Sequence, residues 1–88
     1  MSGMAERITY YAIIAPRFTR ENPSGLARRR EDAEGGVHYE ALGKEMTWHF
    51  SDVIPAWKRL EATEDLEEIS EAEANELIVR FRERWANL

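Results

Sequence analysis

Residues 70–88, SEAEANELIVRFRERWANL, carry the strongest structural signal in the chain. Ser70 followed three residues later by Glu73 is a capping-box spacing, in which each side chain satisfies a free backbone N–H at a helix start. Apolar residues then recur at steps of three and four, so they form one stripe of an α-helix that faces a core. The members of this stripe are Ala74, Leu77, Ile78, Phe81, Trp85 and Leu88. The segment predicts a long C-terminal amphipathic helix.

A second strong signal lies near the start of the chain. Residues 7–15, RITYYAIIA, are rich in the β-branched and aromatic residues that favour strands. Both alternating sets of side chains are largely apolar, which is typical of a strand that is covered on both faces. Pro16 lacks a backbone donor and ends the strand. We therefore expect a central strand here, followed by a surface loop over residues 17–25, where Asn-Pro and Ser-Gly mark turns.

The next segment contains three consecutive arginines. Residues 26–31, LARRRE, have no helical stripe and are followed by Gly35-Gly36, a pattern that predicts a short strand. Adjacent arginines suit an exposed edge strand, where charge discourages aggregation, better than the centre of a sheet. We therefore expect this strand at an edge.

Two more strands are expected further along the chain. Residues 37–42, VHYEAL, and residues 46–50, MTWHF, both alternate, and the segment 43–45 between them fits a short hairpin connection. Together with the earlier strands they predict an antiparallel meander of three or four strands. The side chains expected to face inward from the second of these strands are Met46, Trp48 and Phe50.

A short helix is expected over residues 53–62. Ser51-Asp52 offers an N-cap, and Pro55 is tolerated only in a first helical turn. The expected apolar stripe of this helix is Val53, Trp57 and Leu60. Residues 63–68 then read as an acidic connector, with a short extended piece over residues 66–69.

These elements predict an α+β fold. It consists of an antiparallel sheet of three to four strands, a short helix, and the long C-terminal amphipathic helix packed on one face. Residues 1–88 are expected to form a single small domain.

Composition excludes several classes of function. The chain has no cysteine, so disulfides, thiolate chemistry and cysteine zinc sites are excluded. No apolar run approaches the 18 or so residues of a membrane span, so we expect no membrane association. The first residues, MSGMAER, lack the apolar core of a signal peptide, so we expect a cytoplasmic location.

Four segments together resemble a known group of proteins. They are YYAIIAPR, GLARRR, MTWHFSDVI and LEEISEAEANELI, and they resemble segments of small uncharacterised proteins that are frequent in actinobacteria. The resemblance covers most of the chain and implies a shared scaffold. It implies no activity.

Residues suited to catalysis or metal binding are few. His38 and Glu40 share a strand face, and His49 lies on a neighbouring strand, so the histidines would approach each other if these strands pair. Two histidines 11 residues apart match no metal-ligand spacing, however, and we expect ordinary exposed polar residues and no metal. The serines lie in turns and helix caps without a nucleophile motif. We therefore expect neither an enzyme nor a cofactor.

The arginines are the candidate binding residues. Arginine is the preferred side chain for bidentate contact with phosphate, and nearby tyrosines would stack on single-stranded bases. A nucleic-acid-associated factor with an arginine-rich edge strand is therefore one hypothesis. The net charge of −5 opposes a polyanion, and the alternative is that these arginines pair with neighbouring acids as a surface network. The candidates are Arg28, Arg29 and Arg30, with Arg17 and Arg20 extending the patch.

Protein binding is the preferred hypothesis. Three tryptophans and six other aromatic residues are many for 88 residues, and one helix face and one sheet face need not cover them all. Exposed aromatic residues combined with arginine are typical of interaction hot spots. We therefore expect a small non-catalytic protein-interaction or regulatory module whose partner is another protein or a second copy of the chain.

Overall fold

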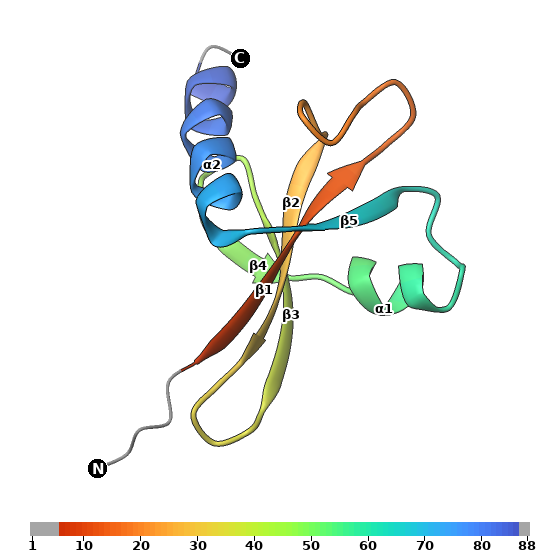
Figure 1. The fold of residues 1–88 in the computed structure, drawn as a ribbon, viewed down its shortest axis with the longest axis vertical. Helices are drawn as coiled ribbons and strands as arrows, with labels where there is room; N and C mark the ends of the chain where they lie inside the picture. The colour runs from red at the N-terminus through yellow and green to blue at the C-terminus, as the bar shows by residue number, and fades with distance from the viewer. Residues whose placement is uncertain (1–5, 87–88) are drawn as a thin grey trace.

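The computed structural model describes residues 6–86, which form one antiparallel sheet and two helices (Figure 1). The strands are β1 (Arg7–Ile14), β2 (Gly25–Glu31), β3 (Val37–Leu42), β4 (Trp48–Phe50) and β5 (Asp65–Ile69), and the helices are α1 (Val53–Lys58) and α2 (Glu71–Ala86). The strand order across the sheet is β4-β3-β2-β1-β5. The predicted α+β class is confirmed, and the sheet has five strands where three to four were expected.

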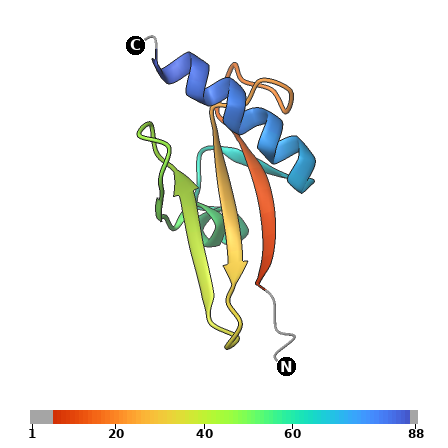
Figure 2. The same cartoon turned by 90° about the vertical axis from the view of Figure 1, so that its left-hand side faces the viewer.

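β1 is the covered central strand that its sequence predicts. It pairs with β2 on one side and with β5 on the other, both antiparallel. Ala12 lies in the core under α2, whereas its neighbour Tyr11 lies in the core under α1. Figure 2 shows α2 in front of the sheet and α1 behind it. The apolar side chains on both faces of β1 therefore hold the two helices on opposite sides.

α2 begins and packs as its sequence predicts. The Glu73 N–H donates to Ser70 Oγ at 3.1 Å, and the Ser70 N–H donates to Glu73 Oε1 at 3.0 Å, which completes the capping box. Phe81 is fully buried and stacks on Trp85, with 4.9 Å between the ring centroids. Leu88, the last member of the predicted stripe, lies outside the described residues. Neither helix within residues 6–86 is long and apolar enough to cross a membrane.

α1 is shorter than its predicted range because the chain turns at Leu60. The Leu60 N–H donates to Trp57 O at 3.0 Å and the Glu61 N–H donates to Ala56 O at 2.8 Å, which is a Schellman helix end. Leu60 has a φ of 61° and is 91% exposed, so its predicted place in the apolar stripe is wrong. Ile54 is the fully buried residue of this helix instead.

The prediction that the arginine-rich strand lies at an edge is wrong. β2 lies between β1 and β3, two strands away from either edge of the sheet. Leu26 and Ala27 at its start are fully buried on opposite faces. Arg28 and Arg30 are tolerated there because β3 places a carboxylate between them, so their charge is paired within the sheet surface.

The acidic segment after α1, which was expected to be a connector, contains an edge strand of the sheet. Residues Asp65–Ile69 pair along β1, and the expected extended piece over residues 66–69 is confirmed as part of β5. Leu66 is buried under α1 and Ile69 under α2, whereas Glu67 and Glu68 between them stay exposed. Acidic side chains at a sheet edge discourage pairing with other strands.

β4 is shorter than predicted and points one aromatic residue outward. Met46 adopts a φ of 66° in the hairpin, and its N–H donates to Gly43 O at 2.9 Å, so the strand begins only at Trp48. Phe50 was expected to face the core but is 82% exposed. Figure 2 shows that α2 crosses only one end of the sheet face on which it packs. The other end of this face is left uncovered, which explains the exposure of Phe50.

Candidate interaction surface

The uncovered part of the α2 side of the sheet forms the candidate surface. Residues that are paired across antiparallel strands share a face, so the register of β1 to β4 defines which side chains gather there. We call this surface the open sheet face. Its residues are Ile8, Tyr10, Arg28, Arg30, His38, Glu40, Trp48 and Phe50, of which Tyr10 and Trp48 form its border with the core under α2.

Glu40 joins the two arginines of this face. Its Oε1 accepts from Arg28 Nε at 2.7 Å, and its Oε2 accepts from Arg30 Nη2 at 3.1 Å. The side chains of Arg28, Arg30 and Glu40 are only 17%, 22% and 15% exposed. The hydrogen bonds from Arg30 and then Arg28 hold the pKa of the Glu40 carboxyl below its ordinary value. The three side chains therefore form a flat, charge-paired layer on the sheet.

An aromatic layer continues this network toward α2. The guanidinium of Arg28 lies 4.2 Å from the centroid of the Trp48 ring, a cation–π arrangement. Tyr10 lies against the same tryptophan, with 6.2 Å between ring centroids. Among residues 6–86, Arg28 uses only Nε in hydrogen bonds, so its terminal nitrogens keep unused donors.

Phe50 is the last residue of the edge strand β4 and lies beside this aromatic layer. It lines a hollow of about 170 Å³ together with Val37 and Glu40. The Ser51 N–H, one residue after the end of β4, donates to Tyr39 O at 2.9 Å. Val37 lies two residues before Tyr39 on β3, so its backbone N–H and C=O groups point to the same edge as those of Tyr39. β4 does not extend far enough to pair with them. An exposed apolar ring and a short stretch of open strand edge therefore lie together.

The three consecutive arginines do not form one patch. Arg28 and Arg30 lie on the open sheet face, whereas Arg29 points to the opposite face, because successive side chains of a strand alternate. There Arg29 lies 3.9 Å from Glu31. The structure thus separates the residues that the sequence places side by side.

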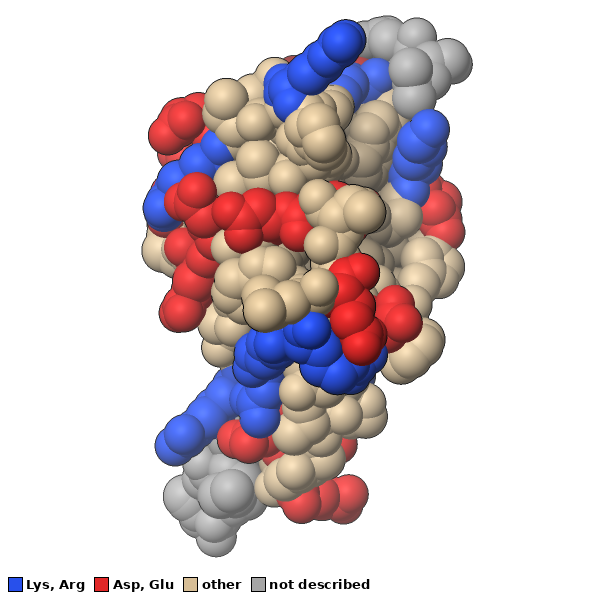
Figure 3. Space-filling model, turned by 90° about the vertical axis from the view of Figure 1, so that its right-hand side faces the viewer, with Lys and Arg blue, Asp and Glu red and all other residues tan. Residues whose placement is uncertain are grey.

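The two other candidate arginines lie in the loop between β1 and β2. Arg20 bonds Glu73 at the start of α2, at 2.9 and 3.0 Å, and lies 3.5 Å from Glu67. Arg17 is exposed, with a φ of 75°. This loop joins the end of β1 that is far from Arg30, so the five arginines do not gather on one surface (Figure 1). On the face seen in Figure 3, basic groups form a short band below the middle of the molecule, with acidic groups next to it.

The histidines lie apart as well. β3 and β4 pair, but His38 lies on the open sheet face and His49 on the opposite one. His38 bonds Asp32 at 2.9 Å and holds the pKa of that carboxyl below its ordinary value, whereas His49 contacts Glu45 and Thr47. In the part of the chain that the structure describes, no group of three or more His, Cys, Asp or Glu side chains is arranged to hold a metal ion.

Sequence reasoning missed the roles of Glu40 and Phe50. The sequence does contain a pattern that predicts the position of Glu40. If residues 32–36 form the turn of a hairpin between β2 and β3, Glu40 lies opposite Arg28. For Phe50 no local signal exists, since its strand alternates as an inward-facing strand does.

No protein-family model matches this chain, and neither a curated protein nor a solved structure matches it.

Proposed function

We propose that this protein is a small, non-catalytic protein-binding module of the cytoplasm and that the open sheet face receives its partner. The observation that carries the proposal is the 82% exposure of Phe50 on a part of the sheet that neither α1 nor α2 covers. Burying a phenylalanine side chain gains about 1.5–3 kcal/mol. A partner that covers Phe50 would gain this free energy on binding.

The surroundings of Phe50 support the same function. Arginine and aromatic side chains are enriched at interfaces and at their energetic centres. Arg28 is already held by Glu40 and by the Trp48 ring, so little side-chain freedom is lost when a partner binds. A rigid surface of this composition is well suited to recognition.

The chemistry of the surface favours a particular kind of partner. An apolar side chain would pack on Phe50 in the hollow beside Val37. A carboxylate next to it would accept from the terminal nitrogens of Arg28, which are unused within residues 6–86. We therefore propose another protein that presents an apolar residue beside an acidic one, in preference to a second copy of this chain.

The test compares Phe50→Ser with Leu60→Ser in the full 88-residue chain. Both residues are highly exposed, but only Phe50 lies on the open sheet face. A partner isolated with the wild-type protein should bind Phe50→Ser at least about tenfold more weakly and Leu60→Ser equally well. Equal binding by all three proteins would contradict the proposal.

Two further measurements separate the alternatives. Sedimentation of the isolated protein at several concentrations should show a monomer, and a dimer that Phe50→Ser abolishes would make the partner a second copy. A short single-stranded DNA should not bind at 150 mM salt. Salt-sensitive binding that is lost when Arg28, Arg29 and Arg30 are replaced by Gln would favour the nucleic-acid hypothesis, since counterion release makes phosphate contacts steeply dependent on salt.

A further inference from the structure

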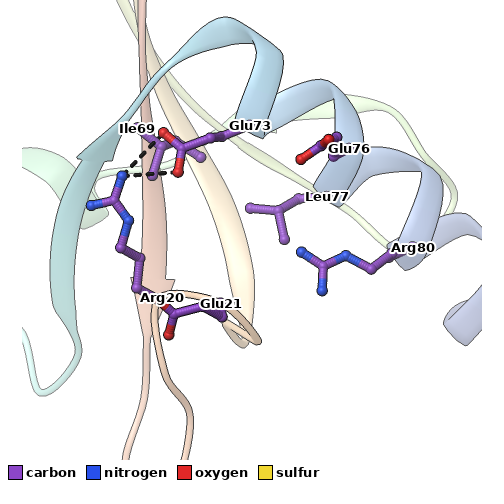
Figure 4. Close-up of a pocket in the computed structure, with 7 residues that line it drawn as sticks. All are labelled: Arg20, Glu21, Ile69, Glu73, Glu76, Leu77 and Arg80. Carbon is purple, nitrogen blue, oxygen red and sulfur yellow. Dashed lines mark hydrogen bonds and ion pairs between the residues drawn. The ribbon is translucent and has the colours of Figure 1, made fainter.

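A second hollow lies under α2, away from the open sheet face. It occupies about 350 Å³ between the first turns of α2 and the loop that joins β1 to β2 (Figure 4). Ile69 and Leu77 form its apolar floor, and both belong to the buried core. The hollow therefore reaches the edge of the core, where 6% of the surface of Ile69 and 4% of that of Leu77 remain exposed.

The loop side of this hollow is fixed and charge-paired. Arg20 Nη2 donates to both carboxylate oxygens of Glu73, at 3.0 and 2.9 Å. Glu73 also accepts from the Ser70 N–H, and this bond, followed by the bonds from Arg20, holds the pKa of its carboxyl below the ordinary value. The charge of Arg20 is thus matched within the protein, and this wall is already in place before a ligand arrives.

The helix side carries two opposite charges for which residues 6–86 provide no side-chain partner. Glu76 and Arg80 are separated by one helical turn, with Leu77 between them, and Figure 4 shows the guanidinium of Arg80 beside Leu77, directed toward the hollow. Within residues 6–86 neither side chain takes part in an ion pair or a hydrogen bond between side chains. A carboxylate and a guanidinium one turn apart, above an apolar floor, are thus available to a ligand.

We propose that this hollow binds a free α-amino acid with an apolar side chain. The ligand carboxylate contacts the Arg80 guanidinium, whose planar fork matches a carboxylate. The ligand ammonium contacts Glu76, or Glu21 at the loop rim, and the side chain packs on Ile69 and Leu77. A purely anionic ligand would meet Glu21 and Glu76 unpaired, and a purely cationic one would meet Arg80, so a zwitterion fits the charges best.

The test is a titration of the 15N-labelled protein with L-leucine, followed by the chemical shifts of its backbone amides. Leucine should shift amides of residues 73–80 and of the loop at residues 20–21 saturably, with a Kd of about 1 mM, as expected for so small a ligand in an open hollow. N-acetyl-leucine lacks the cation and leucine amide lacks the anion, and each should bind about tenfold more weakly.

Three variants connect the binding to the named residues. Arg80→Gln and Glu76→Gln should each weaken leucine binding about tenfold, whereas Arg82→Gln, an exposed arginine of the same helix that does not line the hollow, should leave it unchanged. Unchanged far-ultraviolet circular dichroism shows that the variants fold.

Each contrary result overturns the proposal. An absence of saturable shifts at ten times the expected Kd would show that the hollow holds no such ligand. N-acetyl-leucine binding as tightly as leucine would indicate a site for a carboxylate alone, such as the end of a polypeptide. Equal binding of leucine amide would indicate a site for a cation. None of these outcomes bears on Phe50, so this inference and the proposed function are tested separately.

Discussion

The guanidinium of Arg28 lies over the ring of Trp48, 4.2 Å from its centroid, where the open sheet face meets the core under α2. Arg28 comes from a central strand and Trp48 from an edge strand, so β3 lies between them in the sheet. The contact is possible because Glu40 on β3 holds the arginine by its Nε, which leaves the flat side of the guanidinium for the ring.

Replacing Glu40 with Gln should destabilise the protein. The substitution keeps the size of the side chain but removes the charge that pairs with Arg28 and Arg30, whose side chains are largely buried. We expect a loss of about 1–2 kcal/mol in the free energy of unfolding, measured from urea midpoints. Glu31→Gln is the control, because its contact with Arg29 is 3.9 Å long and more exposed, and it should cost less than about 0.5 kcal/mol.

The contribution of Glu40 should depend on pH. Its pKa in the folded protein is lowered from an ordinary value of 4.5, chiefly by the hydrogen bond from Arg30. The stabilisation is therefore present above pH 4.5 and is lost as the pH falls through the lower folded pKa. Wild type should exceed Glu40→Gln in unfolding free energy at pH 6, and the difference should shrink at pH values near the folded pKa. A difference that grows on acidification would contradict the ion-pair assignment.

Phe81→Ala should be the most damaging single change in α2. Phe81 is fully buried in the core between α2 and the sheet, so its removal leaves a cavity and should cost about 3–5 kcal/mol. A domain of this size has a total stability of about 5–10 kcal/mol, so much of the population would unfold. Val79→Ala on the exposed side of the same helix should change the urea midpoint little. Coincident midpoints for Phe81→Ala and wild type would show that the helix does not pack as described.

Ser70→Ala should lower stability by about 1 kcal/mol, since the Glu73 N–H loses its acceptor. The sequence alone predicts almost no effect for Ser24→Ala. In the structure, however, Ser24 Oγ donates to Ile13 O at 2.8 Å and accepts from the Ala15 N–H at 3.3 Å, so we now expect a comparable loss. Thr63→Ala, at an exposed position, serves as the neutral control in thermal unfolding.

Leu60→Gly should stabilise the protein. Leu60 occupies the left-handed position of the Schellman helix end, where glycine has no steric penalty, and its side chain is almost fully exposed, so little packing is lost. We expect the free energy of unfolding to rise by about 0.5–1 kcal/mol, a figure that already allows for the greater freedom of glycine in the unfolded chain. This corresponds to a rise of about 2–8 °C in Tm. Leu60→Ala keeps the backbone penalty and should give no such rise.

The sequence by itself determined the elements whose signals are local. The capping box at Ser70 and Glu73 and the apolar stripe through Phe81 specify where α2 begins and which side it buries, because all of these groups lie within a few turns of one helix. The apolar side chains on both faces of β1 likewise predicted a central strand, since two covered faces require layers on both sides.

Only the tertiary structure determined which side chains form the open sheet face. The position of β2 depends on which strands pair with it, and Arg28 is acceptable there only because the register of β3 places Glu40 beside it. Phe50 alternates as a buried residue would, and only the limited reach of α2 across the sheet leaves it exposed. Burial is a property of the whole packed chain, so a residue's own neighbours in sequence do not determine whether another element covers it.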